Sequence, residues 1–152
     1  KNPSPTFLSF KFPKRRSQES NGTEQVTDAR PRILVIDDQA VILDLVSAMC
    51  QTIGYSVDPA RSGEVGLRLA GEHDYALILV DLAMPGLSGL EVARMLRRQK
   101  PGVPVVLMTG WEASLDRAAL NDAGIVEVLY KPFRIEQLSD LLRSFTKARP
   151  AL

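Results

Sequence analysis

The chain has 152 residues, which is enough for one domain with a substantial core and too few for two ordinary ones. Its composition, 45% hydrophobic and 24% charged, is that of a globular protein and excludes fibrous and largely disordered classes. A net charge of +1 gives no general attraction to nucleic acid or membranes, and a single cysteine excludes an intrachain disulfide framework.

The first 29 residues differ in composition from the rest of the chain. Leu8, Phe10 and Phe12 alternate with polar residues, which is the period-two signal of a β-strand, and the run stops at a proline. A lone strand is not stable by itself, so we expect it to complete a domain that lies upstream. The polar stretch 17–30 is typical of a flexible linker. We therefore predict a partly disordered linker over residues 1–29.

Short apolar runs follow from Pro31 onwards. Four of them show no alternation of apolar and polar residues, and each ends at a polar residue. They are ILVI (33–36), LILV (77–80), VVLM (105–108) and EVLY (127–130), and a weaker strand is expected at 55–59. Strands of this kind, bounded by turn residues, are typical of a parallel sheet that is covered on both faces.

Apolar residues recur at helical spacing between these strands. Three sets are clear: Val41, Leu45, Met49 and Ile53; Leu90, Ala93 and Leu96; and Ile135, Leu138, Leu142 and Phe145. Gly54 stands where the glycine that ends a helix is expected, and Cys50 is expected to be a small buried filler. Five strands and five helices in strict alternation predict an α/β fold with a doubly wound, five-stranded parallel sheet.

Polar residues follow the four clear strands. They are Asp37 and Asp38, Asp81, Thr109, and Lys131. Any one of them alone has an ordinary explanation as a helix cap, a strand end or a solvated charge. Because functional groups of such sheets gather at the carboxyl ends of the strands, we expect all of them to lie at one edge.

The three carboxylates would repel one another at this edge. Two carboxylates about 4 Å apart repel by roughly 4 kcal/mol at an effective dielectric of about 20. They must therefore be partly protonated or hold a cation. Oxygen ligands suit Mg²⁺, whereas His73 is the only histidine and no Cys/His cluster exists that would bind zinc.

Phosphoryl transfer fits this set of residues. The reaction needs positioning and charge neutralisation, and a carboxylate can act as the nucleophile to give an acyl phosphate. Lys131 would pair with a carboxylate at rest and with a phosphoryl oxygen after transfer. Thr109 would offer its hydroxyl to a second phosphoryl oxygen.

Four segments resemble the response-regulator receiver family. They are ILVIDDQ (33–39), LILVDLAMPGLSG (77–89), VVLMTG (105–110) and YKPF (130–133), and the likeness covers residues 30–147. The resemblance implies a flavodoxin-like (βα)5 receiver fold over residues 30–148, with a C-terminal tail over 149–152.

The resemblance also implies roles for single residues. Asp81 would be the phosphorylation site, Thr109 the switch hydroxyl and Lys131 the lysine that contacts the phosphoryl group. The Mg²⁺ ligands would be Asp37, largely through water, and, directly, Asp38, Asp81 and the main-chain carbonyl of Ala83. Members of the family usually have a cis peptide bond before the proline that corresponds to Pro132. Gly89 would begin the helix that follows the Asp81 loop.

Two departures from the family pattern bear on signalling. Many members carry an aromatic residue three positions before the lysine, where this chain has Val128, and the aromatic residue is Tyr130 instead. A Thr/aromatic switch of the usual kind is therefore not expected. Ala83 and Trp111 occupy positions that influence attack of water on the acyl phosphate, and we hypothesise that they lengthen the phosphorylated state.

The predicted function is that of a phosphoacceptor domain in a two-component phosphorelay, rather than of an enzyme. The donor would be the phosphohistidine of a histidine kinase or a histidine phosphotransfer protein. No direct contact with nucleic acid is expected. Because no apolar run approaches the roughly 18 residues of a membrane span, we also expect no membrane contact. The single cysteine fits a reducing, cytoplasmic location, which leaves open a membrane-anchored parent chain.

Two parent contexts remain open. Residues 5–16 resemble the closing strand of a histidine-kinase ATPase domain, which favours a hybrid histidine kinase over a stand-alone single-domain regulator. A phosphatase or a flavin-binding enzyme on the same fold is a remote alternative. The phosphatase would need an Asp-x-Asp sequence after its strand, and Asp37 and Asp38 would repel a flavin phosphate.

Overall fold

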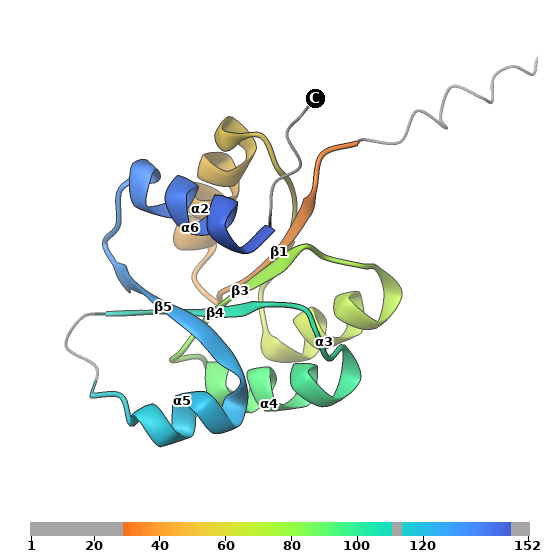
Figure 1. Cartoon of the computed structure of the whole chain (residues 1–152), viewed down its shortest axis with the longest axis vertical. Coiled ribbons are helices and arrows are strands. Elements are labelled where there is room, and N and C mark those ends of the chain that lie inside the picture. The colour runs from red at the N-terminus through yellow and green to blue at the C-terminus, as the bar shows by residue number, and fades with distance from the viewer. Residues whose placement is uncertain (1–28, 111–113, 147–152) are drawn as a thin grey trace, which may run out of the picture.

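Five strands and five helices alternate along the described part of the chain, which a computed structural model covers at residues 29–110 and 114–146 (Figure 1). The elements are β1 Arg32–Ile36, α2 Ala40–Ile53, β2 Ser56–Ala60, α3 Gly63–Glu72, β3 Leu77–Asp81, α4 Gly89–Gln99, β4 Val105–Gly110, α5 Arg117–Ala123, β5 Ile125–Lys131 and α6 Ile135–Thr146. The predicted strand near Leu8, the tail over 149–152 and Trp111 lie outside the described residues. The linker and domain boundaries therefore stay predictions.

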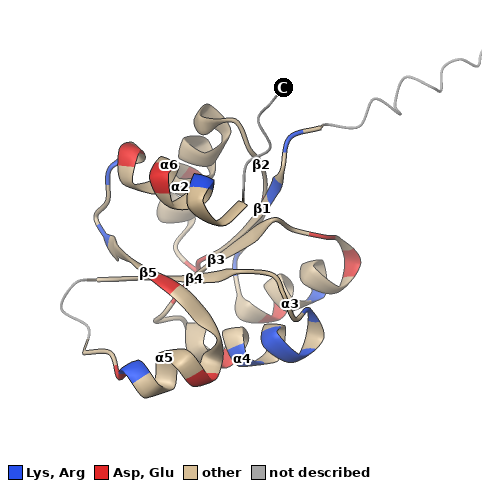
Figure 2. Cartoon of the chain, viewed as in Figure 1, with Lys and Arg blue, Asp and Glu red and all other residues tan. Residues whose placement is uncertain are grey.

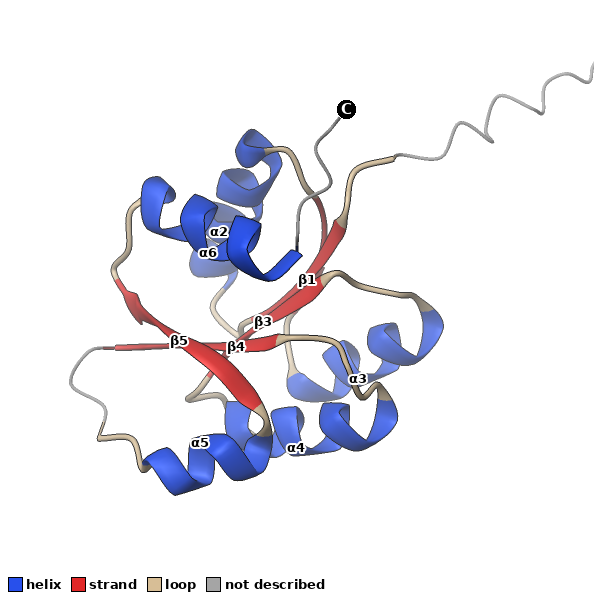
Figure 3. Cartoon of the chain, in the orientation of Figure 1, coloured by secondary structure: helices blue, strands red, loops and turns tan. Residues whose placement is uncertain are grey.

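The strands form one parallel sheet in the order β2-β1-β3-β4-β5. Helices α2 and α6 cover one face of the sheet, and α3, α4 and α5 cover the other (Figure 3). The predicted doubly wound fold is confirmed. The chain order reverses between β1 and β3, so the carboxyl ends of these two neighbouring strands are the expected place for a functional site.

Two apolar layers explain why the central strands show no alternation. In β1, Ile33 and Val35 pack against α2 and α6, while Leu34 and Ile36 pack on the side of α3 and α4. All four side chains are fully buried. A strand that is covered on both faces needs apolar residues at every position, as β1 and β3 have.

The structure buries a different side of α2 from the one that the spacing of Val41 and Leu45 indicated. The helix forms as predicted and ends at Gly54, but Val41 is 77% exposed and Leu45 is 53% exposed. The buried residues are Leu43, Val46 and Cys50. A four-residue repeat turns by about 400°, so it drifts around the helix instead of following one face. The buried set advances by three and then four residues, which keeps it on one face.

Helix α4 begins in close contact with the end of β3. The backbone N–H of Gly89 donates to the Leu82 carbonyl at 2.8 Å, and Ser88 and Glu91 cap the helix reciprocally. A Cβ atom at position 89 would lie 2.9 Å from Leu82 Cα and still closer to the Asp81 carbonyl oxygen. Only glycine lets α4 start so near Asp81.

Within the described residues, no helix is both long enough and apolar enough to cross a membrane. Cys50 is buried among apolar side chains, as predicted, and burial raises the pKa of its thiol to about 12. The thiol is therefore unreactive in the folded protein.

Candidate functional site

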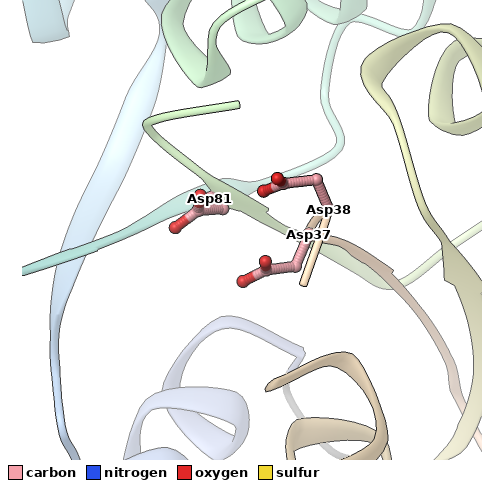
Figure 4. Close-up of side chains that lie close together, drawn as sticks. All are labelled: Asp37, Asp38 and Asp81. Atoms are coloured by element: carbon pink, nitrogen blue, oxygen red, sulfur yellow. The ribbon is translucent and has the colours of Figure 1, made fainter. Parts of the chain in front are cut away.

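Three carboxylates converge where β1 and β3 end. Asp37 and Asp38 follow β1, and Asp81 is the last residue of β3 (Figure 4). The register pairs Ile36 with Val80, which brings Asp37 beside Asp81. One carboxylate oxygen from each of the three residues lies within 4.8 Å of the others. The carboxylates that the sequence predicted to meet are therefore together.

Asp37 is held from three sides. Its Oδ1 accepts the backbone N–H of Gln39 at 2.9 Å, and its Oδ2 accepts from Lys131 Nζ at 3.1 Å. Its own backbone N–H donates to the Ala60 carbonyl at 3.0 Å. With 0% of the residue exposed, these contacts compensate for burial and fix the direction of the carboxylate.

Lys131 joins two of the three carboxylates. Its Nζ lies 2.7 Å from Asp81 Oδ1 in addition to its contact with Asp37. The residue ends β5, and the peptide bond to Pro132 is cis, as the family resemblance implied. One ammonium against three carboxylates leaves the site negatively charged when every group is ionised, so a cation is attracted to it.

Burial and neighbouring charges act on both partners of this contact. Burial raises the pKa of Asp81, and the charges of Asp37 and Asp38 raise it further, whereas the hydrogen bond and charge of Lys131 act against this. For Lys131, burial alone would lower the pKa, but the contacts with Asp81 and Asp37 outweigh it and the pKa is raised. Lys131 therefore remains an ammonium at neutral pH.

Thr109 lies on β4, one residue beyond the partner of Asp81, since the register pairs Asp81 with Met108. It is buried, like Asp37 and Asp81. Its own neighbour on β5 is Tyr130, which is 45% exposed, while Val128 pairs with Leu107 deeper in the sheet. An irregularity at Val105 and Val106 contributes to this register. The aromatic residue beside Thr109 is therefore Tyr130.

Ala83 lies on the loop that follows β3, and its side chain is exposed. Its role as a carbonyl ligand stays a prediction. Sequence reasoning missed the hydrogen bond that the backbone N–H of Gln39 donates to Asp37. Aspartate side chains commonly accept the backbone N–H of the residue two positions later in a local turn. The position of Asp37 just before a helix was therefore the available signal for this hydrogen bond.

The residues present fit a magnesium ion. All three side chains offer oxygen ligands, one oxygen of each lies within 4.8 Å of the others, and their charge exceeds what Lys131 neutralises. Asp38 is half-buried, and its carboxylate makes no hydrogen bond or ion pair within the described part of the chain.

A family model of the response regulator receiver domain matches residues 33–143. The transcriptional regulatory protein YkoG of Bacillus subtilis, described as uncharacterized, is 38% identical over 74% of this chain and 49% of its own length. TcrA of Mycobacterium tuberculosis is 33% identical over 78% of this chain and 47% of its own length. This chain thus spans about half the length of these curated relatives.

Solved structures give the same picture. The receiver domain of the sensor histidine kinase PA1611 from Pseudomonas aeruginosa, which has a magnesium ion in its active-site cleft, is 30% identical with a TM-score of 0.72. That match covers 79% of this chain and all of the other. TrrA from Thermotoga maritima, in complex with Mg²⁺ and BeF, is 34% identical with a TM-score of 0.69, covering 76% and 98%.

Proposed function

Because the chain belongs to the response regulator receiver family, we propose that Asp81 accepts a phosphoryl group from a phosphohistidine, with Mg²⁺ bound beside it. The observation that carries this proposal is the cluster of buried Asp37 and Asp81 with half-buried Asp38, in which Lys131 Nζ lies 2.7 Å from Asp81. Receiver domains take phosphoryl groups from histidine kinases.

The chemistry is a direct transfer. A carboxylate oxygen of Asp81 forms a bond to phosphorus as the bond from phosphorus to the donor imidazole nitrogen breaks, and the imidazole leaves with the bonding electrons. The Lys131 ammonium neutralises one phosphoryl oxygen, and the Thr109 hydroxyl donates a hydrogen bond to a second. Asp37, Asp38, Asp81 and the carbonyl of Ala83 would hold the metal, which supplies positive charge against the phosphoryl oxygens.

Incubation with Mg²⁺ and acetyl phosphate tests the proposal, because a small donor needs no partner protein. Intact-mass measurement should find one added phosphoryl group on the chain and none on the Asp81→Asn variant. Removal of Mg²⁺ with a chelator should abolish the adduct. The proposal is wrong if neither acetyl phosphate nor a phosphohistidine protein yields any adduct.

For the parent chain we propose a hybrid histidine kinase. The likeness to the receiver domain of the sensor kinase PA1611 and the strand pattern of residues 5–16 support it. The curated relatives are transcriptional regulators, so a receiver that precedes a DNA-binding domain is a competing candidate, and a stand-alone regulator is a third. Sequencing the gene on both sides of this segment decides between them, since a hybrid kinase requires an ATP-binding domain upstream. The family assignment leaves no reason to propose a phosphatase or a flavin enzyme.

A further inference from the structure

Helix α5 is weakly anchored by packing. It has only seven residues, Arg117–Ala123, and Ala123 is the one that is fully buried. Its contacts are with α4 and β5. A helix this short and this exposed depends on polar contacts to keep its position.

Arg97 of α4 supplies such contacts at the end of α5. Its Nη1 donates to the carbonyl oxygens of Asn121 at 3.1 Å and of Asp122 at 2.8 Å. The side chain passes beneath Gly124, where a Cβ atom would lie 3.1 Å from Arg97 Cδ. Gly124 has a φ of +76°, the left-handed conformation that ends a helix and that glycine adopts without strain. The chain thus leaves room for the arginine under the last turn.

The charge of Arg97 suits this place. The last carbonyls of a helix carry partial negative charge and lack partners within the helix. A guanidinium satisfies two of them with charge-assisted hydrogen bonds, which are stronger than neutral ones. Arg94 adds an exposed ion pair with Asp122, Nε to Oδ2 at 3.1 Å, which is worth less because solvent screens it. Figure 2 shows the basic positions of α4 on the ribbon.

Helix α4 connects these contacts to the site. Its first residue, Gly89, touches the end of β3 at Asp81, and its later turns hold α5 through Arg97. α5 also packs on β5, where Tyr130 is the neighbour of Thr109. A displacement of Thr109 toward a phosphoryl group on Asp81 therefore acts on α5 through β5, against the contacts of Arg97.

We propose that Arg97 is a positioning residue that holds α5 in its resting place and thereby opposes phosphorylation of Asp81. The inference rests on the proposed function and names the regulation of the same site. Contacts that stabilise the resting arrangement more than the phosphorylated one weaken the binding of a phosphoryl group or its mimic by the same factor.

The test compares Arg97→Met with Arg98→Met in the full chain. Methionine keeps an unbranched stem and removes the donors. Arg98 is also exposed on α4, and it makes no hydrogen bond or ion pair within the described ranges 29–110 and 114–146. Beryllofluoride with Mg²⁺ serves as the phosphoryl mimic, and its affinity and the hydrogen exchange of the α5 amides are measured for each protein.

We expect Arg97→Met to bind beryllofluoride about fivefold more tightly than the wild type, and Arg98→Met to bind like the wild type. In the absence of the mimic, the α5 amides should exchange faster in Arg97→Met alone. Faster exchange with unchanged beryllofluoride affinity would overturn the proposal, since Arg97 would then be only a structural contact, and unchanged exchange would overturn it as well. Arg97→Gln, a milder change, should shift both measurements in the same direction. Failure of the wild type to bind the mimic at all would instead contradict the proposed function.

Discussion

Burial has the largest effect on the pKa of Asp81 and raises it above the ordinary value of 3.8. A carboxyl group whose pKa is raised by folding contributes stability below its unfolded pKa and loses it as the pH rises through the folded value. The ionised Asp81 therefore destabilises the metal-free protein at neutral pH, although Lys131 reduces the cost.

Asp81→Asn should raise the free energy of unfolding at neutral pH in the presence of a chelator, because asparagine resembles the protonated acid. Each pKa unit of the shift corresponds to about 1.4 kcal/mol. The gain should shrink as the pH falls through the raised pKa of Asp81 and vanish below about 4. Urea unfolding at a series of pH values measures it, and a gain that is independent of pH would contradict this account.

Lys131→Met tests the ammonium that two carboxylates share. Its removal leaves Asp37 and Asp81 without a positive partner, and Asp37 is wholly buried. We expect a loss of about 2–4 kcal/mol in the free energy of unfolding without metal. Added Mg²⁺ should restore part of the loss, because it supplies the missing charge.

Lys100→Met is the matched control for Lys131→Met. Lys100 pairs with Asp74, whose side chain is exposed, so solvent screens the pair and its loss should change stability little. Equal effects of the two substitutions, or an effect of Mg²⁺ on the Lys100 variant alone, would rule out the assigned role of Lys131.

Ala83→Asn addresses the lifetime of the acyl phosphate. The exposed methyl group of Ala83 cannot position a water molecule, whereas a carboxamide two residues after Asp81 can. The variant should lose its phosphoryl group up to about tenfold faster, a change of about 1.4 kcal/mol in activation free energy. Release of inorganic phosphate after removal of the donor measures the rate, and slower or unchanged release contradicts the hypothesis.

At the scale of elements, the start of α4 determines how close the helix comes to Asp81. Gly89→Ala would push a methyl group against the backbone of Asp81 and Leu82, which no side-chain rotation relieves. We expect a loss of about 1–3 kcal/mol and a lower Mg²⁺ affinity, because the loop that carries Ala83 must shift. Unfolding experiments and Mg²⁺ titration measure both.

Gly71→Ala, inside α3, is the control for Gly89→Ala. A methyl group there meets only the end of the Gln99 side chain, and alanine favours a helix. The control should be neutral or stabilising. If Gly89→Ala behaves like it, the close approach of α4 to Asp81 is not required.

The sequence was a better guide to which segments form strands and helices than to which side of a helix is buried. The apolar runs that end in polar residues gave all four clear strands, since a strand between two helical layers must be apolar throughout. The buried side of α2 was not predictable from the repeat of Val41 and Leu45, because packing in the core buries Leu43, Val46 and Cys50 instead. The register of Tyr130 beside Thr109 depends on an irregular pairing of β4 with β5, which only the folded sheet defines.

At the scale of the whole molecule, the doubly wound topology brings the site together. Residues from β1, β3, β4 and β5 reach one edge because parallel strands all end on the same side. This is why Asp37, Asp38, Asp81 and Lys131 could be predicted as a group without a structure. Interactions that run through backbone atoms, such as the carbonyls held by Arg97, have no comparable signal in the sequence.

Localisation of the phosphoryl group tests the central claim most directly. The chain is phosphorylated with acetyl phosphate and Mg²⁺, the acyl phosphate is reduced with borohydride, and the modified residue is identified by peptide mass spectrometry. The account predicts modification at Asp81 alone, and only when Mg²⁺ is present. Modification at Asp37, Asp38 or His73, or an undiminished adduct in Asp81→Asn, would contradict it.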